Sequence, residues 1–502
     1  MKKIAAGAIV AGCISPWLYC KFTYSSVPGR IHTNDEEKHV VIVGSGIFGI
    51  ATAHALAQLR EDLRITIIDR DTPTSSNIGM PRGAASWGNA CTLGTSSKPQ
   101  NLATFSFLSS IVNPPKKQMP KDATLRDASI EEKKQHERHK SNKQFQMKTF
   151  LDTLFIRWGL TYVKALIGGT PFEARTEWTE DERVCLLDAI SETLSERERQ
   201  SVRLNGRLIV NLDPEYECVT ARDRLTSQEP CLGAVDTIVS GTRYVEDAQG
   251  SCEDVGSNLL RRLAKNGRVT VSNSSQVERI LMENGLVKGV QLSDGSEIRA
   301  SSVVVCAGGS SSEITMTAGV YVPIQPLRGY SLTVPVIEKN SHLAVQDCVV
   351  VKPYQLYTTR TISENRDCVR FTCYGEMTPV KDCMDTPTPE LFQQLEDLVR
   401  HVYKKDLENY LNWESRVKWM GCRPLSPDSS PIAGRTSVPN LYICSGGSFN
   451  GWRASFLSAR VAAAAYAEDN NMKIPIKWTT KEEKMNNTLL FYRNAYSLER
   501  FQ

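Results

Sequence analysis

The sequence predicts an α/β protein, and three consecutive segments near its start carry this prediction. Residues 39–43 form a continuous, mainly apolar run that ends at a glycine, as expected of a strand buried in a parallel sheet. Residues 50–59 are rich in Ala and Leu, which favour a helix. Residues 64–69 alternate in polarity and predict a second strand. Together the three segments form a βαβ unit of about 30 residues.

Three glycines occupy the turn between the first strand and the helix, with the spacing Gly-x-Gly-x-x-Gly. Gly44 permits the tight turn, Gly46 leaves room for backbone N–H groups to approach a diphosphate, and Gly49 lets the helix pack closely on the sheet. The helix N-terminus adds partial positive charge. Asp69 ends the second strand, 20 residues after Gly49, where its carboxylate can accept hydrogen bonds from a ribose. This is a Rossmann-type dinucleotide site, which by itself fits either FAD or NAD.

The rest of the chain predicts further helices and strands. Two tight turns, Asn-Gly and Asp-Gly, join three expected strands, and a Gly-rich turn separates a late strand from an Ala-rich helix. The expected helices cover residues 150–167, 390–403 and the stretch that ends at 467, and the expected strands cover 276–282, 286–292, 297–306 and 441–444.

The N-terminus combines two lysines with an apolar run over residues 4–19. This run is slightly short for a spanning helix, which needs about 20 residues, and longer than the usual core of a signal peptide, about 7–15 residues. An uncleaved anchor, a cleaved signal and an organellar targeting segment are the alternatives. We favour membrane association through this segment, in an organelle such as the mitochondrion or on an extracytoplasmic face.

Composition excludes several classes of protein. Lys and Arg number 60 against 56 acidic residues, so the net charge of +4 is too small to predict nucleic acid as a partner. The 14 cysteines follow no framework and are expected to be mostly free, buried thiols. The chain has no His-Glu-x-x-His or similar signature, so we expect no metal site.

Several motifs resemble those of the D-amino acid oxidase-like flavoproteins, most closely the small subunit of the D-amino acid dehydrogenases. The Gly-x-Arg-Pro-x-x-Pro-Asp block at residues 421–428 is the most specific of them. The resemblance implies FAD as the cofactor and a Rossmann-type FAD-binding domain interleaved with a mixed-sheet α+β substrate domain. The matching stretches are residues 40–70, 85–90, 303–308, 326–332, 421–434 and 451–452.

The resemblance also implies how the chain is divided. The expected segments are an anchor or signal (1–20), a linker (21–37), the FAD-binding domain in three parts (38–110, 246–325 and 416–470), a mainly helical insert of the substrate domain (111–245), the substrate domain (326–415) and a C-terminal tail (471–502).

The same resemblance implies the residues that bind the cofactor. They come from the glycine turn and the acid after it, from a loop beside the flavin, from the strand that holds the adenine, and from a second Gly-rich turn before a helix. They are Gly44, Gly46, Ile47, Phe48, Gly49, Asp69, Arg70, Ser86, Asn89, Ala90, Val277, Ala307, Gly308, Gly446, Asn450, Gly451 and Trp452.

Oxidation of an amino acid requires its carboxylate to be held away from the flavin, and a planar guanidinium suits that task. Arg423 resembles the carboxylate-binding arginine of the family; the alternative is a structural arginine that pairs with a loop carbonyl or with Asp428. Tyr330 resembles a position near the flavin, but a buried tyrosine with a bonded hydroxyl fits equally well. Tyr354 and Tyr357 are weaker candidates for the substrate pocket. The implied reaction converts a D-amino acid or related amine to an imino acid, with a quinone or oxygen as electron acceptor.

Four departures from the family pattern keep a second function open. Cys91 stands where glycine is usual, Gly447-Ser448 where His-Gly is frequent, Arg453 where a small hydroxyl residue is common, and Thr372-Cys373 where a glycine pair follows Arg370. Residues 116–148 also carry ten basic against five acidic side chains. The alternative is a non-catalytic, FAD-containing assembly or scaffold protein of a membrane complex.

Overall fold

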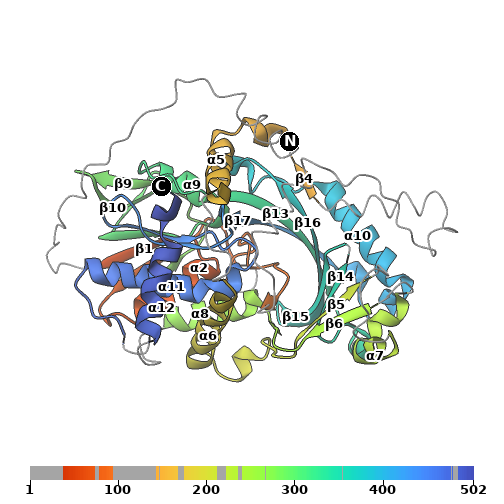
Figure 1. The fold of residues 1–502 in the computed structure, drawn as a ribbon. Coiled ribbons are helices and arrows are strands. Elements are labelled where there is room, and N and C mark those ends of the chain that lie inside the picture. Colours follow the sequence, from red (N-terminus) through yellow and green to blue (C-terminus); the bar gives the residue numbers. More distant parts are fainter. Residues whose placement is uncertain are drawn as a thin grey trace.

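The computed structural model describes two large sheets that lie side by side, one covered by helices on one face and one strongly curved, together with two small sheets of three and two strands (Figure 1). The described residues are 38–73, 78–93, 143–145, 147–167, 175–211, 222–235, 240–265, 267–352, 354–475, 478 and 484–501. The expected anchor and linker, and most of the basic run at 116–148, lie outside them. Within the described ranges, no helix is long and apolar enough to cross a bilayer.

The first sheet confirms the predicted βαβ unit. Strand β1 (His39–Val43) is fully buried because parallel neighbours flank it on both sides, and α2 (Ile47–Ala57) connects it to β2. Helix α11 (Gly451–Asp469) packs against α2 on the same face. The strand order is β18 (Ile432–Arg435), β19 (Leu441–Ser445), β12 (Ser302–Val305), β1, β2 (Arg64–Ile68) and β8 (Val269–Ser272).

Two sequence-predicted boundaries are wrong. Helix α2 begins at Ile47 rather than at residue 50, because Gly46 is already the N-cap. The expected strand at 297–306 is two strands in different sheets. Its first part, β11 (Glu297–Arg299), pairs with β10 (Leu286–Leu292), which pairs in turn with β9 (Val277–Glu283). The chain then crosses to β12, where the Ser301 amide donates to the His39 carbonyl (2.9 Å). No turn residue marks this crossing.

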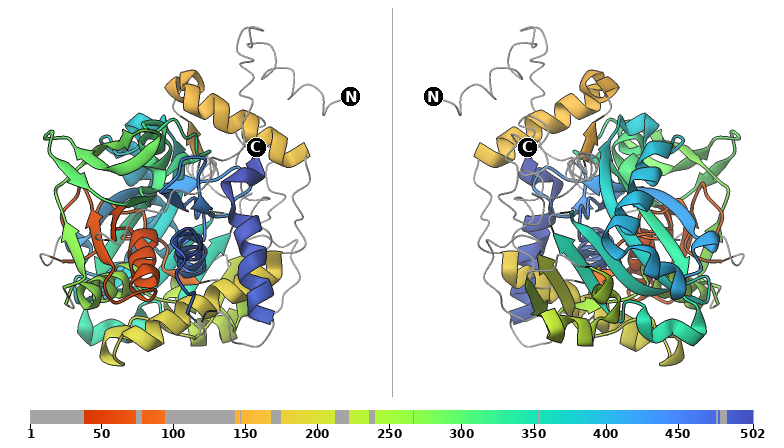
Figure 2. Two further views of the ribbon diagram at one scale, coloured as in Figure 1. Left: turned by 90° about the vertical axis from the view of Figure 1, so that its left-hand side faces the viewer. Right: turned by 90° about the vertical axis from the view of Figure 1, so that its right-hand side faces the viewer.

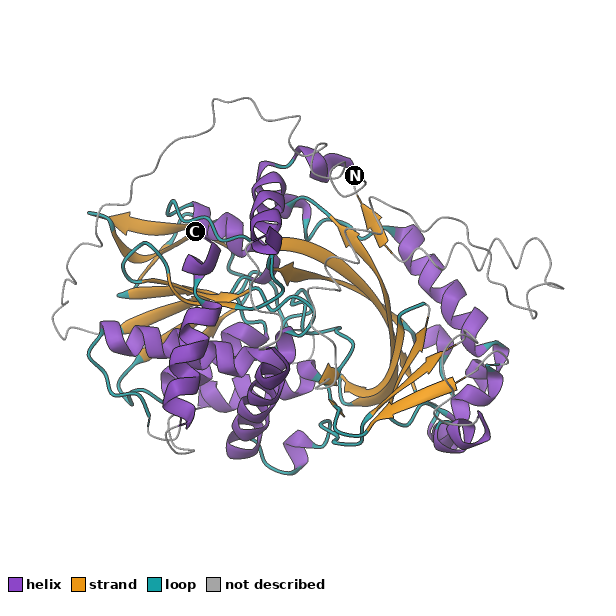
Figure 3. Cartoon of the chain, viewed as in Figure 1, coloured by secondary structure: helices purple, strands orange, loops and turns teal. Residues whose placement is uncertain are grey.

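The second sheet is curved, and its convex face packs against α10 (Pro389–Tyr403) (Figure 3). Three of its strands come from the insert expected to be mainly helical, and its edge strand β17 begins in the stretch assigned from residue 416 to the FAD-binding domain. The order is β17 (Val417–Leu425), β13 (Gln325–Pro335), β16 (Arg366–Met377), β15 (Leu356–Ser363), β14 (Cys348–Lys352), β5 (Arg207–Asn211) and β6 (Ser240–Tyr244), and β4 (Lys143–Phe145) pairs with β16.

Helices α2 and α11 cover one face of the first sheet, strands β9 to β11 cover its other face, and α5 lies on the outside of the molecule (Figure 2). The helix expected at 150–167 is a 3-10 turn, Met147–Leu151, followed by α5 (Thr153–Ile167). The remaining helices and short strands are α6 (Arg175–Thr193), α7 (Arg222–Gln228), α8 (Cys252–Lys265), α9 (Ser311–Met316), α12 (Lys484–Tyr496), β3 (Thr92–Leu93) and β7 (Ala248–Gln249).

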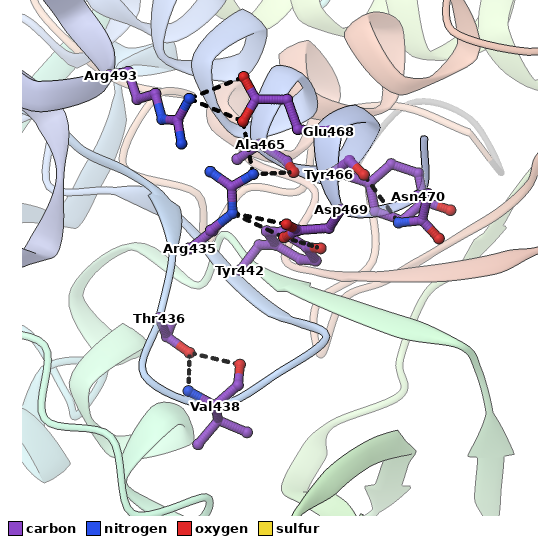
Figure 4. Close-up of polar contacts among 10 residues, drawn as sticks. All are labelled: Arg435, Thr436, Val438, Tyr442, Ala465, Tyr466, Glu468, Asp469, Asn470 and Arg493. Carbon is purple, nitrogen blue, oxygen red and sulfur yellow. Dashed lines mark hydrogen bonds and ion pairs between the residues drawn. The ribbon is translucent and has the colours of Figure 1, made fainter. Parts of the chain in front are cut away.

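Charged contacts fasten the C-terminal end of α11 to its neighbours (Figure 4). Arg435 at the end of β18 donates through Nε to Asp469 Oδ2 (2.9 Å) and through Nη2 to Glu468 Oε2 (2.8 Å). Arg493 of α12 donates to the same glutamate (2.9 Å). These contacts hold α11 so that its N-terminus lies beside the turn that follows β1.

Candidate active site

The turn after β1 accepts only glycine at two of its three motif positions. Gly44 has φ of +105°, and a Cβ on it would lie 2.5 Å from the carbonyl oxygen of Cys306. A Cβ on Gly49 would lie 1.9 Å from the carbonyl oxygen of Gly44. Gly46 differs, because the nearest atom to its Cβ position is the Ala84 Cβ at 3.7 Å. Protein atoms therefore explain Gly44 and Gly49, whereas Gly46 leaves space for a ligand.

Asp69 lies directly after β2, with its carboxylate held by the glycine turn. The amide of Ser45 donates to Oδ2 (2.6 Å), as does the Ser45 hydroxyl (2.9 Å), and the amide of Asp71 donates to Oδ1 (3.0 Å). Arg70, which follows, lies 3.8 Å from the Asp71 carboxylate. These bonds fix the acid at the edge of the sheet where a ribose is expected.

A cavity with about 1530 Å³ of free space, part of it open to solvent, runs from this turn to β17. It brings together most of the predicted cofactor residues, from segments far apart in the chain. Gly49 and Gly446 do not line it: Gly49 packs on the turn, and Gly446 (φ +76°) shapes the backbone before α11. The predicted residues that do line it are Gly44, Gly46, Ile47, Phe48, Asp69, Arg70, Ser86, Asn89, Ala90, Val277, Ala307, Gly308, Asn450, Gly451 and Trp452.

The start of α11 presents polar atoms at the cavity. Asn450 Nδ2 and Trp452 Nε1 are buried and have no hydrogen-bond partner in the described part of the chain. Both residues line the cavity. Because buried donors are nearly always satisfied, these atoms fit a ligand that carries acceptors, such as the polar edge of a flavin.

The loop beside the expected flavin is held from behind by Arg370 of β16, which is fully buried. Its guanidinium donates to the carbonyls of Trp87 (3.1 Å) and Asn89 (3.4 Å) and to the Thr333 hydroxyl (2.9 Å). Cys91 has φ of +57°, which explains why glycine is usual there. A non-glycine residue in this conformation costs about 1 kcal/mol, so the departure at Cys91 is a tolerated strain.

Arg423 is a cation in the cavity wall without a protein anion. No carboxylate or other hydrogen-bond acceptor in the described ranges binds its guanidinium, and burial lowers its pKa. The Cζ atom of its guanidinium lies 5.7 Å from the centre of the Phe449 ring. Asp428, the alternative partner, is bound instead by Arg500, whose Nε lies 2.9 Å from Oδ2. The alternative that Arg423 is a structural arginine paired with Asp428 is therefore wrong.

Tyr330 does not line the cavity and lies on the other face of the second sheet. Its hydroxyl donates to Glu376 Oε2 (2.8 Å) and accepts from the Thr388 amide (3.2 Å). Its ring meets Phe392 of α10 at 5.1 Å. The predicted position of Tyr330 beside the flavin is therefore wrong. The register explains it: Leu327 pairs with Arg423, and a residue three positions further along β13 faces the opposite side.

The two weaker tyrosine candidates also separate by face. Tyr354 is buried in the hydrophobic cluster under α10. Tyr357 pairs in register with Thr372, on the face that carries Arg423. Burial raises the pKa of Tyr357, and the nearby charges of Arg207 and Arg423 oppose that shift. Tyr357 is thus the tyrosine on the side of the candidate substrate site, and strand register, not sequence motif, distinguishes it.

Arg453, the departure at the start of α11, forms a buried ion pair. Its Nε lies 2.8 Å from Glu182 Oε2, and both side chains are 6% exposed. Tyr496 of α12 donates to the other oxygen of Glu182 (2.7 Å). The arginine therefore joins three helices, and the described contacts assign it no part in the cavity.

Replacing Arg453 by Ser should lower the free energy of unfolding by about 3–5 kcal/mol, because it leaves the Glu182 carboxylate buried and unpaired. Urea denaturation measures this change. Arg493→Ser is the matched control: its arginine is 42% exposed, so its loss should cost less than about 1 kcal/mol. Equal effects of the two substitutions would contradict the structural role of Arg453.

Glu253, in the first turn of α8, should make stability depend on pH. Burial raises its pKa from 4.5 to about 7, partly offset by the charge of Arg370. The folded state then binds more protons than the unfolded state between these values, so its contribution is present at low pH and lost as pH rises through about 7.

Glu253→Gln should remove this dependence, which amounts to about 3 kcal/mol between pH 4.5 and 7. Urea denaturation of both proteins at pH 5 and pH 8 provides the measurement. Glu229, whose pKa burial also raises to about 7, contributes to both proteins alike, so the difference between them isolates Glu253. An unchanged pH slope in the variant would contradict the assignment.

Comparison with known proteins places this geometry in a wider context. The family model described as FAD dependent oxidoreductase, DAO, matches residues 39–465. The chain is similar to L-proline dehydrogenase from P. horikoshii (18% identity, TM-score 0.53, covering 93% of this chain and 98% of that chain). It is also similar to glycine oxidase from Geobacillus kaustophilus (18% identity, TM-score 0.55, 86% and 95%). A third similar structure is iminodiacetate oxidase from Chelativorans sp. BNC1 (14% identity, TM-score 0.52, 87% and 97%). At these identities the solved structures show a shared fold.

Proposed function

This chain belongs to the DAO family of FAD-dependent oxidoreductases, and from that membership we propose that it oxidises the CH–NH group of a D-amino acid or a related amine that carries a carboxylate. The observation that carries the proposal is Arg423, a guanidinium in the cavity wall that no carboxylate or other acceptor of the described residues binds.

Arg423 is half-buried, and a cation that is partly removed from water without a partner is unfavourable, so its presence needs a reason. Arg423 lies beside Pro424 and Phe449 in the wall, and the backbone of Gly329 approaches so closely that a Cβ there would lie 3.2 Å from its Nε. A substrate carboxylate would accept two parallel N–H bonds from the planar guanidinium. That arrangement fixes the orientation of an amino acid as well as its position.

Orientation is the main contribution of the protein to this reaction. FAD, when bound, accepts the hydride from the substrate carbon. Arg423 holds the carboxylate away from the reacting carbon, and Arg370 keeps the loop from Trp87 to Cys91 in place through its carbonyl contacts. The imino acid that results hydrolyses in water to a 2-oxo acid and ammonia, which needs no catalytic dyad.

The names of the similar structures support an amino-acid or secondary-amine substrate, since they include a proline dehydrogenase, a glycine oxidase and an iminodiacetate oxidase. A substrate carboxylate is common to all three names. The preference for the D-enantiomer comes from the resemblance of the motifs at residues 326–332 and 421–434, and is the finer part of the proposal.

Anaerobic flavin reduction tests the proposal. The purified flavoprotein is mixed without oxygen with D-amino acids, L-amino acids, N-methyl amino acids and the corresponding amines that lack a carboxylate. We expect a D-amino acid or N-substituted amino acid to bleach the flavin, and the carboxylate-free amines to leave it oxidised. Absence of bleaching by every compound would overturn the proposal. Adding oxygen or a quinone to the reduced protein then identifies the electron acceptor.

The scaffold alternative drew its support from the departures beside the flavin and from the basic run at residues 116–148, most of which lies outside the described residues. Cys91 now has a conformational explanation, and Arg453 is occupied by its ion pair with Glu182. Neither departure removes the unpaired cation at Arg423, which a scaffold would have no need to keep. We therefore favour the enzyme.

We also propose that residues 4–19 attach the protein to a membrane surface, on the strength of their sequence. The outer side of the molecule offers some support, because the 3-10 turn before α5 and α5 itself expose Leu151 (83%), Ile156 (43%) and Leu160 (42%). Flotation with anionic lipid vesicles tests this attachment. The full chain should float and a chain that starts at residue 38 should not; equal behaviour of the two would refute a role for the N-terminal segment.

A further inference from the structure

Two cysteine side chains meet in the wall of the cofactor cavity. Cys383 follows the 3-10 turn Val380–Asp382, and Cys422 lies on β17, one residue before Arg423. Both line the cavity and are buried. The Cys422 thiol donates to the Cys383 carbonyl, so the two residues are in direct contact. They are 39 positions apart in the sequence, so only the fold brings them together.

The surroundings of Cys383 favour its thiolate. Contact with Cys422 lowers the pKa of Cys383 to about 7, against the opposing effect of burial, and Ser310 and Arg70 lower it further. The Ser310 hydroxyl lies 3.6 Å from its sulfur. Burial and the contact with Cys383 raise the pKa of Cys422. The Cys383 sulfur is therefore suited to attack an oxidant as a thiolate, whereas Cys422 stays protonated.

Other described cysteines have the opposite character. Burial raises the pKa of seven of them, whereas the pKa of Cys383 is lowered. The cysteines with a raised pKa are Cys185, Cys231, Cys252, Cys306, Cys348, Cys368 and Cys422. Because the cavity opens to solvent, small oxidants have a route to this thiol.

We propose that Cys383 and Cys422 form an oxidation site, which a peroxide converts to a disulfide in the wall of the cofactor cavity. The Cys383 thiolate attacks one peroxide oxygen, the O–O bond breaks, and the departing hydroxide takes up a proton and leaves as water. The resulting sulfenic acid is attacked by Cys422, the S–S bond forms, and a second water leaves. Two thiols thus supply two electrons, and one hydrogen peroxide becomes two waters.

The disulfide would join two parts of the cavity wall that are now held by weaker contacts. Arg328 donates to the carbonyl of Cys383 (3.3 Å), and two further hydrogen bonds reach the carbonyls of Asp382 and Asp385 (3.3 Å for Asp385). Met384 lies against Gly83 on the far side of the segment. A covalent link from this segment to β17 restricts opening of the wall, so we expect oxidised protein to release FAD severalfold more slowly than reduced protein.

The test treats the purified flavoprotein with hydrogen peroxide, blocks free thiols by alkylation and digests it without reduction. We expect a disulfide-linked peptide that contains Cys383 and Cys422, slower release of FAD after dilution, and reversal of both by dithiothreitol. Cys383→Ser should abolish the link, and Cys422→Ser should leave a sulfenic acid that a sulfenic-specific reagent captures. Cys368→Ser, a buried thiol outside the cavity wall, is the control and should leave the link intact.

The other outcomes overturn the proposal in different ways. Oxidation of Cys383 to sulfinic acid without a link, or a link to a different cysteine, would refute the pairing. A link that leaves the rate of FAD release unchanged would refute the closing of the wall. None of these readouts uses a substrate, so their failure is distinct from failure of the proposed amine oxidation.

Discussion

Replacing Arg423 by Met should raise the KM for an amino-acid substrate by at least about 100-fold while FAD remains bound. Each hydrogen bond to a charged group contributes about 1.5–3 kcal/mol, and a bidentate pair supplies two of them. Methionine keeps the length and apolar stem of the side chain but removes every donor. Steady-state kinetics with the substrate found by anaerobic reduction, together with the flavin absorbance of the purified variant, provide the measurement.

The same substitution should leave the unfolding free energy unchanged or raise it. No protein anion in the described ranges depends on Arg423, so its removal abolishes an unfavourable burial of charge and orphans no partner. Arg328, on the adjacent strand, is the control: it is fully buried and lies 3.3 Å from the Glu376 carboxylate, whereas Arg423 is half-buried. Arg328→Met should destabilise the protein by about 3–5 kcal/mol.

Changes of opposite sign in the unfolding free energy for these two substitutions would distinguish a binding role for Arg423 from a structural one. If Arg423→Met lowered stability as Arg328→Met does, the guanidinium would be part of the framework and the proposed carboxylate site would be wrong. An Arg423 variant that binds FAD and keeps the cellular function of the protein would favour the scaffold alternative, because a protein that does not oxidise amines has no use for this cation.

Local features of the sequence predicted the βαβ unit that lines one end of the cavity. The turn from Gly44 to Gly49 and the acid at Asp69 lie within one βαβ unit, so their positions depend on neighbours close in the chain. The loop near Asn89 and the start of α11 at Gly451 are distant, and here resemblance to a family supplied what spacing alone does not contain.

Features that depend on strand pairing could not be predicted from the sequence. Tyr330 and Arg423 both lie in motifs, yet one faces α10 and the other faces the cavity, and only the register between β13 and β17 decides this. The crossing at Ser301 occurs inside a run that reads as one strand. The meeting of Cys383 with Cys422 likewise requires the curved sheet to place β17 beside a turn from another part of the chain.

Alanine substitutions at two glycines of the same motif should impair different properties, folding in one case and FAD binding in the other, and this difference tests the placement of the cofactor directly. Gly49→Ala should prevent formation of a stable protein, because its Cβ would lie 1.9 Å from the backbone oxygen of Gly44, and we expect a loss of more than about 4 kcal/mol. Gly46→Ala meets nothing closer than 3.7 Å and has φ of −66°, which alanine adopts readily. Its unfolding free energy should change by less than about 1 kcal/mol.

The Gly46 variant should nevertheless bind FAD at least about 100-fold more weakly, because its methyl group would occupy the space through which backbone N–H groups approach the diphosphate. Urea denaturation of the FAD-free forms and titration with FAD separate the two effects. A folded Gly46→Ala protein with normal FAD affinity would show that the diphosphate does not lie against this turn. Since the roles of Arg423 and of the loop near Asn89 are both defined relative to the flavin, that single result would also remove the geometric basis for the proposed oxidation.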